Sequence, residues 1–236
     1  PGAKHAKGLR LAPGEHIAVI DAAQDYFECE IASLDDDFPL VRITRHEEAT
    51  DDGPLVMLVQ GLAKGEKMDS VIRHATELGV AAFMPLTCER SIVKLDAKKT
   101  RTRLDRWCSI AKSAAMQSGQ PRIPEVLEPR SAKEAAVELA EATAVLICWE
   151  EAPQTASLAQ AIGRGLSECS CPRGDARIAV VVGPEGGLTE REVGFFLEAN
   201  PRASLVSLGS SILRTETAGV VAPALTLYEL GKLGGT

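Results

Sequence analysis

The chain has 236 residues and a mass of 25.1 kDa, which allows one large domain or a small domain followed by a medium one. Its 45% hydrophobic and 25% charged residues are typical of a soluble globular protein, and no apolar run is long enough to cross a bilayer. The net charge of -7 argues against indiscriminate binding to nucleic acid, because such binding depends on neutralising phosphates.

The start of the sequence and its cysteines bear on the cellular compartment. The chain begins at Pro1 rather than Met and lacks a signal-peptide pattern, so we expect a cytoplasmic protein from which an N-terminal piece is missing. The cysteines have neither the spacing of a disulfide framework nor that of a zinc site, so we expect reduced thiols and no metal. They are Cys29, Cys88, Cys108, Cys148, Cys169 and Cys171.

The first part of the chain predicts a small antiparallel β unit. Short strands are expected at 16–20, 26–32 and 38–44, separated by turn-rich segments with nothing helical between them. The segment Thr50-Asp51-Asp52-Gly53-Pro54 breaks this pattern. We therefore predict one domain over residues 1–50 and a second over 54–236.

After Pro54, strands and helices alternate. Such alternation predicts an α/β domain with a mostly parallel sheet and helices on both faces. The expected strands are 55–60, 80–86, 144–149, 177–182 and 203–208. The expected helices are 66–78 closed by Gly79, 96–118, 131–141 and 189–200 opened by capping boxes, 155–166 and 215–230.

The predicted helix 96–118 carries two features of interest. Leu104, Trp107, Cys108, Ala111 and Ala115 recur at helical spacing, which favours a core role for Trp107 over stacking on a base. The second feature is a basic run that either meets a phosphate backbone or forms a solvated helix face. The run comprises Lys94, Lys98, Lys99, Arg101 and Arg103 against Asp96 and Asp105, and the smaller cluster Lys4, Lys7 and Arg10 leaves the same alternatives open.

Two glycine-containing loops follow two consecutive predicted strands. Residues 183–187 read GPEGG after the strand 177–182, and residues 209–218 follow the strand 203–208. The carboxyl ends of parallel strands meet at one sheet edge, where glycines allow a ligand to approach the backbone closely. Tight turns without a ligand are the alternative. A phosphate-binding loop fits less well, because no Gly-Lys-Ser/Thr follows.

These two loops also carry a resemblance to a known family. GPEGG followed by LG-x-x-ILRTETA resembles the cofactor-binding end of the knotted SPOUT methyltransferases, and most closely the ribosomal small subunit methyltransferase E family. That family methylates N3 of a uridine in 16S ribosomal RNA with S-adenosylmethionine. The segments AKGEKM at 63–68 and HATELGV at 74–80 resemble the same family, and the likeness covers nearly everything after residue 54.

The resemblance implies more than the residues alone predict. It implies a SPOUT-type sheet with a C-terminal trefoil knot in residues 54–236, and a PUA-like RNA-binding β-barrel in residues 1–50 whose first strand is absent from this sequence. It further implies a homodimer that acts on 16S ribosomal RNA, within the small ribosomal subunit. S-adenosylmethionine is the implied cofactor.

The resemblance also assigns site residues. Arg214 is the expected catalytic residue, because its planar fork suits a uracil or a phosphate, and Glu216 is the weaker candidate for the proton step. Both have plainer alternatives, an ion pair for Arg214 and a favourable charge in a first helical turn for Glu216. The expected cofactor-binding residues are Ile147, Gly183, Glu185, Gly186, Leu208, Gly209, Ile212, Leu213, Thr217 and Ala218. For Leu208, Ile212 and Leu213 a plain core position is the alternative.

Two other functions stay open at this point. One is a SPOUT methyltransferase with another RNA target, and the other is a non-catalytic RNA-binding or ribosome-assembly protein. The chain also departs from the family pattern, since Ser210 and Ser211 stand where the family usually reads Pro-Arg. This departure removes a cation near the expected target and bears on RNA contacts more than on the cofactor.

Overall fold

The computed structural model describes residues 11–21, 25–34, 39–47, 53–93, 96–153 and 156–234. The chain divides into two compact units, residues 1–51 with 119–122 and residues 52–118 with 123–236. The basic cluster Lys4, Lys7 and Arg10, together with Lys94, lies outside the described residues.

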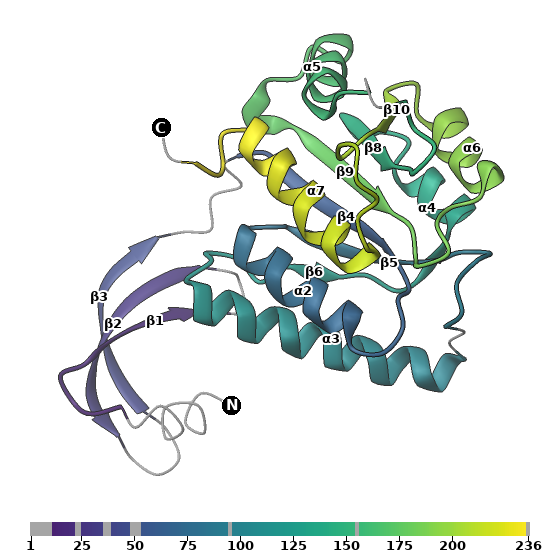
Figure 1. Cartoon of the computed structure of the whole chain (residues 1–236). Coiled ribbons are helices and arrows are strands. Elements are labelled where there is room, and N and C mark those ends of the chain that lie inside the picture. Colours follow the sequence, from purple (N-terminus) through teal and green to yellow (C-terminus); the bar gives the residue numbers. More distant parts are fainter. Residues whose placement is uncertain are drawn as a thin grey trace. The chain divides into compact units, whose positions relative to one another are not determined.

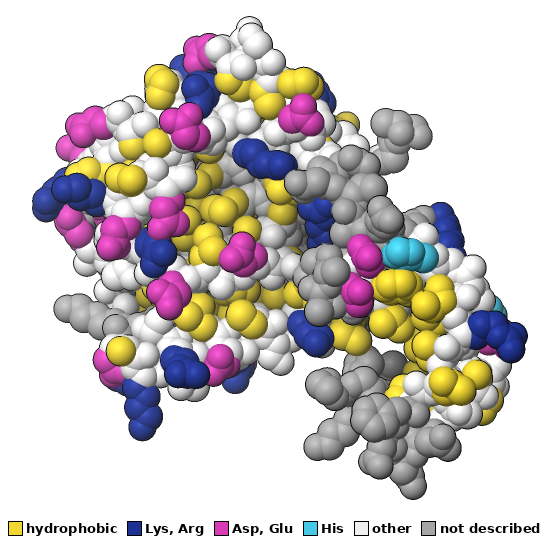
Figure 2. All heavy atoms as spheres, turned by 180° about the vertical axis from the view of Figure 1, so that it is seen from behind, with side chains coloured by type: hydrophobic (Ala, Val, Ile, Leu, Met, Phe, Trp, Pro, Cys, Tyr) yellow, Lys and Arg dark blue, Asp and Glu magenta, His cyan; other side chains and the backbone are white. Residues whose placement is uncertain are grey.

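The smaller unit contains the predicted antiparallel sheet. Its strands pair in the order β1-β2-β3 (Figure 1). Cys29 and Ile31 of β2 point to one face and are buried, as the two-residue period of a strand requires. Hydrophobic side chains also gather on the surface of this unit (Figure 2), where Leu40 and Ile43 of β3 are exposed. The strands are β1 His16–Ile20, β2 Tyr26–Leu34 and β3 Pro39–Glu47.

The larger unit is built on a parallel sheet, which confirms the predicted α/β architecture. The strand order is β10-β8-β9-β4-β5-β6, with β7 paired to β5. The middle strands β8, β9 and β4 are buried along most of their length, which explains why they read as continuous apolar runs. The strands are β4 Leu55–Gly61, β5 Ala82–Thr87, β6 Glu125–Val126, β7 Arg130–Ser131, β8 Ala144–Cys148, β9 Arg177–Val182 and β10 Ala203–Val206.

Helices cover both faces of this sheet (Figure 1). Residues of α2, α3, α5 and α7 join one hydrophobic cluster, and residues of α4 and α6 join the other. The capping boxes Ser131/Glu134 and Thr189/Glu192 are formed as predicted, and Gly79 is left-handed at φ 97° after α2. The helices are α2 Lys67–Leu78, α3 Ala97–Ser118, α4 Ala132–Glu138, α5 Leu158–Glu168, α6 Glu190–Ala199 and α7 Thr215–Glu229.

The inner face of α3 confirms one expectation and corrects another. Trp107 is 2% exposed and its Nε1 donates to Oδ1 of Asp69 at 3.1 Å, so it belongs to the core and its buried N–H has a partner. The prediction that Cys108 faces inward is wrong, because its side chain is exposed. The buried stripe consists of Trp107, Ala111, Ala114 and Ala115, and Cys108, one residue after Trp107, points away from it.

The described residues contain neither a membrane-spanning helix nor a cluster of metal-binding side chains. No helix in that part of the chain is long and apolar enough to span a membrane. Among the same residues, no group of three or more His, Cys, Asp or Glu side chains is arranged to hold a metal ion.

Candidate active site

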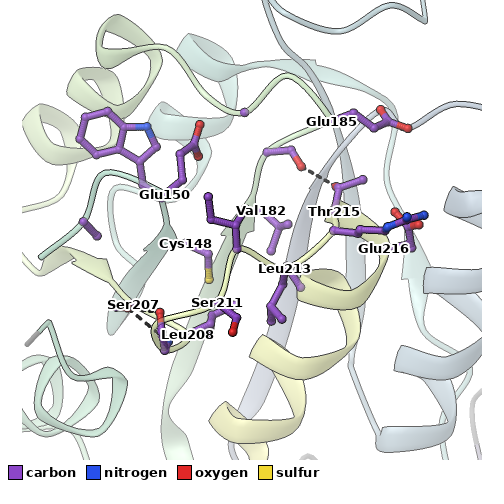
Figure 3. Close-up of a pocket in the computed structure, with 18 of the residues that line it drawn as sticks. Cys148, Glu150, Val182, Glu185, Ser207, Leu208, Ser211, Leu213, Thr215 and Glu216 are labelled. Carbon is purple, nitrogen blue, oxygen red and sulfur yellow. Dashed lines mark hydrogen bonds between the residues drawn. The ribbon is translucent and has the colours of Figure 1, made fainter. Parts of the chain in front are cut away.

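A pocket of about 770 Å³ lies at the carboxyl ends of β8, β9 and β10. The two glycine-containing loops form much of its wall, and the first turns of α2 and α7 complete it (Figure 3). Its lining residues are Lys67, Cys148, Trp149, Glu150, Ala152, Val182, Gly183, Pro184, Glu185, Gly187, Val206, Ser207, Leu208, Gly209, Ser210, Ser211, Ile212, Leu213, Arg214, Thr215, Glu216 and Ala218. The sheet edge expected from the sequence is therefore hollowed.

The pocket brings together most of the residues expected at a cofactor and catalytic site. Those that line it are Gly183, Glu185, Leu208, Gly209, Ile212, Leu213, Arg214, Glu216 and Ala218. Ile147, Gly186 and Thr217 are outside the lining. Ile147 is fully buried in the cluster beneath the sheet, and the next residue, Cys148, faces the pocket in its place. This follows from the alternation of side chains along a strand, so only the backbone of Ile147 is left for a ligand.

The glycine loop after β9 is packed tightly against two other segments. A Cβ on Gly61 at the end of β4 would lie 2.3 Å from the backbone nitrogen of Pro184. A Cβ on Gly186 would lie 2.8 Å from Cβ of Arg90, whose Nη1 donates to the Gly186 carbonyl at 3.2 Å. Gly186 is thus committed to a contact with the segment after β5. The loop keeps its shape because neighbouring backbone fills the space on both sides.

A buried hydrogen-bond chain joins β4, the glycine loop and α7. Nε2 of Gln60, a residue with no exposed surface, donates to Oγ1 of Thr215 at 2.9 Å. That hydroxyl donates in turn to the carbonyl oxygen of Gly183 at 2.6 Å (Figure 3). A Cβ on Gly219 would lie 2.3 Å from Oε1 of Gln60, so α7 packs directly on this amide. The start of α7 is therefore fixed against the loop at 183 by groups that water does not reach.

Lys67, in the first turn of α2, ties the two walls of the pocket together. Its Nζ lies 3.0 Å from Oε1 of Glu185 in one loop and 3.2 Å from Oε2 of Glu216 at the start of α7. The contact with Glu216 has the distance of an ion pair without the alignment of a hydrogen bond. Oε1 of Glu185 also accepts from the backbone N–H of Lys64 at 3.0 Å. One ammonium group thus bridges two carboxylates from separate loops.

These contacts set the charges of the three groups. The side-chain hydrogen bond to Glu185, followed by the contact with Glu216, raises the pKa of Lys67 above 10.5. Burial raises the pKa of Glu185, but backbone N–H groups and the Lys67 ammonium together hold it below 4.5. The backbone N–H of Glu216 lowers the pKa of its own carboxyl group, and Lys67 lowers it further. All three groups are therefore charged near neutrality.

We expect Lys67→Met to remove this bridge and to lower the free energy of unfolding by an amount that depends on pH. Both carboxylates have lowered folded pKa values, so the stability that the bridge contributes is present above pH 4.5 and is lost as the pH falls through those values. Urea unfolding at several pH values should show Lys67→Met less stable than the native chain at pH 7, with the difference vanishing in acid. Lys98→Met, at an exposed lysine of α3, is the matched control. A difference that persists in acid would contradict the prediction.

Arg214 is held through its backbone, and its side chain acts on Glu216 through charge, adding to the backbone N–H and Lys67 in lowering the pKa of that carboxyl group. It is the N-cap residue of α7, and its carbonyl accepts from the N–H groups of Thr217 at 2.9 Å and Ala218 at 2.8 Å. The side chain is exposed in the pocket wall, and within the described ranges its guanidinium makes no hydrogen bond or ion pair. All five of its N–H donors remain available to a ligand.

Several lining residues escaped the sequence analysis. Lys67 and Glu150 are charged, and Trp149 donates from Nε1 to the Leu188 carbonyl at 3.3 Å. Glu150 directly follows the predicted strand 144–149, so its position at a strand end was a usable signal. Trp149 was predicted inside that strand, which in the structure ends at Cys148. For Lys67 the sequence offered one indication, its place in the family-like segment 63–68. No local pattern shows that α2 begins beside the loops at 183 and 214.

Three comparisons bear on this pocket. A family model for an RNA methyltransferase domain matches residues 52–227. The chain is 34% identical over 230 residues to the ribosomal RNA small subunit methyltransferase E of Bacillus subtilis, an alignment that covers 96% of this chain and 87% of that protein. The matched range contains the parallel sheet and the pocket.

Solved structures show the same fold. A ribosomal RNA small subunit methyltransferase E from Neisseria gonorrhoeae bound to S-adenosylmethionine superposes with a TM-score of 0.77 at 29% identity, covering 96% of this chain and 88% of that one. A methyltransferase from Legionella pneumophila in complex with the same cofactor superposes with a TM-score of 0.76 at 27% identity, with the same coverage of 96% and 88%. Both neighbours carry a bound methyl donor.

Proposed function

The chain belongs to the ribosomal RNA small subunit methyltransferase E family, and from this premise we propose that it methylates N3 of a specific uridine in 16S ribosomal RNA with S-adenosylmethionine. The observation that supports this most directly is the pocket at the carboxyl ends of β8, β9 and β10, which unites both motifs of the family. Arg214 stands in the wall of this pocket, where its guanidinium would be available to the RNA substrate.

The pocket suits S-adenosylmethionine in size and chemistry. Its volume of about 770 Å³ lies within the range of small-molecule sites. Backbone of the glycine loops and the apolar side chains of Leu208, Leu213 and Ala218 would hold the adenosine half. The carboxylates of Glu150, Glu185 and Glu216 outnumber the cations Lys67 and Arg214, which favours a positively charged ligand. When bound, the cofactor supplies an electrophilic methyl group on a sulfonium.

Arg214 is the proposed catalytic residue. N3 of uracil lies between two carbonyl groups and becomes a good nucleophile only when it loses its proton. A free guanidinium in the pocket wall would pair with a uracil oxygen and stabilise the negative charge that develops there. The capped backbone of Arg214 would hold this side chain in place without using its donors.

Glu216 is proposed as the proton acceptor, in a role weaker than that of Arg214. Its lowered pKa keeps the carboxylate ionised at neutral pH and therefore able to take up the N3 proton. The same lowered pKa makes it a weak base, so most of the driving force would come from stabilising the uracil anion. Lys67 would act as a positioning residue, because it aligns Glu216 with Glu185.

The finer architecture of the family is part of the proposal. We propose that the C-terminal segment forms the trefoil knot of SPOUT enzymes. The path of the chain from β10 to α7 supports the knot. The strand β10 lies at one edge of the sheet, whereas α7 packs against α2 and against β4, near the middle of the sheet. The chain must cross the ends of β8 and β9 on the way. An experimental structure in which residues 177–236 pass through no loop would remove the knot, which is rare among proteins.

We propose also that residues 1–50 form a PUA-like RNA-binding domain and that the protein is a cytoplasmic homodimer acting on the small ribosomal subunit. The three-stranded antiparallel sheet is compatible with part of such a barrel. Leu225 and Tyr228 of α7 are exposed apolar positions that suit a subunit interface. In a sizing experiment the dimer would elute near twice 25.1 kDa, and a species of 25.1 kDa would contradict it.

The decisive experiment combines binding and methylation. Calorimetric titration with S-adenosylmethionine should give a saturable signal, whereas a binding module without a cofactor site would give none. Small subunits from a strain that lacks the enzyme are then incubated with protein and labelled cofactor, and the modified nucleotide is mapped. Label on N3 of one uridine of 16S ribosomal RNA supports the proposal. Label on another RNA, or on a ribose, would replace the proposed substrate.

A further inference from the structure

The first half of α3 is strongly basic in a chain that is acidic overall. Residues 97–105, which we name the α3 overhang, carry four basic side chains and one acidic side chain, while the whole chain has a net charge of -7. Most of these residues are exposed, and the buried stripe of the helix begins only at Trp107. The charged residues are Lys98, Lys99, Arg101, Arg103 and Asp105.

The α3 overhang extends beyond the helix that α3 packs against. Arg106, the next residue, contacts the start of α2, with Nη2 2.6 Å from Oδ2 of Asp69 and 3.6 Å from Oε1 of Glu66. The nine residues before it form about 14 Å of helix, at about 1.5 Å per residue. Figure 1 shows α3 running on past α2. That same turn of α2 carries Lys67, so the overhang projects from the end of the unit where the pocket lies.

Most of this charge has no partner among the residues that the structure describes. The side chains of Lys98, Arg101 and Arg103 make no ion pair or hydrogen bond in the part of the chain that the structure describes. Lys99 pairs at 3.3 Å with Asp96, but both side chains are well exposed and the pair contributes little. In this stretch Leu104 is partly buried against the core and no residue is fully buried, so packing stabilises it little. A ligand with the opposite charge would account for both its composition and its length.

We propose that the α3 overhang is a docking surface for the phosphate backbone of the RNA substrate. This inference rests on the proposed function, since it needs an RNA that presents one nucleotide to the pocket. Phosphate contacts fix the register of a nucleic acid without reading its bases, which leaves recognition of the uridine to the pocket. Because the rest of the chain carries the excess of negative charge, this basic surface would also orient the RNA on approach.

The test removes two charges from the overhang and, in a control, two charges elsewhere. Lys98→Gln with Arg101→Gln changes exposed helix positions whose side chains make no hydrogen bond or ion pair with the described residues. The control is Lys112→Gln with Lys133→Gln, which removes the same charge from two other exposed positions. Lys112 lies in the second half of α3, and Lys133 lies in α4, which packs on the opposite face of the sheet from α3. The KM for unmethylated small ribosomal subunits is measured at several salt concentrations, and the affinity for S-adenosylmethionine is measured in parallel.

We expect the overhang variant to bind the cofactor normally. Its KM for small subunits should rise roughly 10- to 30-fold near physiological salt. The slope of log KM against log salt concentration should become shallower by about two, one for each charge removed. The control should resemble the native protein. An overhang variant with native KM and native salt dependence would overturn the inference, as would an equal loss in the control. If the native protein itself methylates no small-subunit RNA, the proposed function fails instead, so the two failures are distinguishable.

Discussion

Arg214→Ala should lower the rate of methyl transfer to small ribosomal subunits by about 100-fold or more, the usual effect of removing a group that stabilises charge in a transition state. Its affinity for S-adenosylmethionine and its unfolding midpoint should stay close to the native values. The side chain is exposed and makes no contact that holds the described fold together, so its removal costs the structure little. Single-turnover transfer of labelled methyl and calorimetric titration measure the two effects separately.

Arg214→Lys provides the control for charge. It keeps a cation at the position but loses the planar fork, so we expect an activity between those of the native protein and Arg214→Ala. Native activity in Arg214→Ala would remove this residue from the mechanism. Equal losses of activity and of cofactor affinity would instead assign it to cofactor binding.

Gly61→Ala should disrupt the cofactor pocket although Gly61 is not one of the residues that line it. The added Cβ would lie 2.3 Å from the nitrogen of Pro184 and 2.6 Å from the carbonyl carbon of Gly183, and both atoms are backbone. Relief requires a shift of the loop, so we expect a loss of stability of about 1–3 kcal/mol. A shift that costs 1.4 kcal/mol of binding would weaken the affinity for S-adenosylmethionine about tenfold. Urea unfolding and calorimetric titration test both expectations.

Gly163→Ala is the matched control for this substitution. Gly163 lies within α5, where an added Cβ meets nothing within 4 Å, so the change should stabilise the helix by up to about 1 kcal/mol and leave cofactor binding unaltered. If Gly61→Ala binds the cofactor as tightly as the native chain, the close approach of β4 to the glycine loop does not shape the pocket.

Most secondary structure could be predicted because its signals are local. The capping boxes at Ser131 and Thr189 and the left-handed Gly79 each depend on groups a few residues apart, and all three are present in the structure. The strands β6 and β7 were missed, since two residues are too few to display a period. Cys108 was misplaced because one residue at the border of a helical stripe decides between the core and the solvent.

In the candidate site, too, the features with local sequence signals were predicted and those that depend on distant contacts were not. The loops at 183 and 209 were found from their glycines and their place after strands, and the pocket lies between them. The contacts that hold these loops in place could not be predicted from the sequence. Cys148 rather than Ile147 faces the pocket because the register and tilt of β8 in the sheet decide which side chain does so.

By itself the sequence determined the alternation of strands and helices, the position of both loops and the family, because each depends on residue types at short spacing. Only the tertiary structure decided that Lys67 bridges Glu185 and Glu216 and that Gln60 bonds to Thr215, 155 residues away. Such contacts form when strands distant in the sequence pair side by side and helices pack across them. Their energy comes from groups that meet only in the folded chain, so no local pattern encodes them.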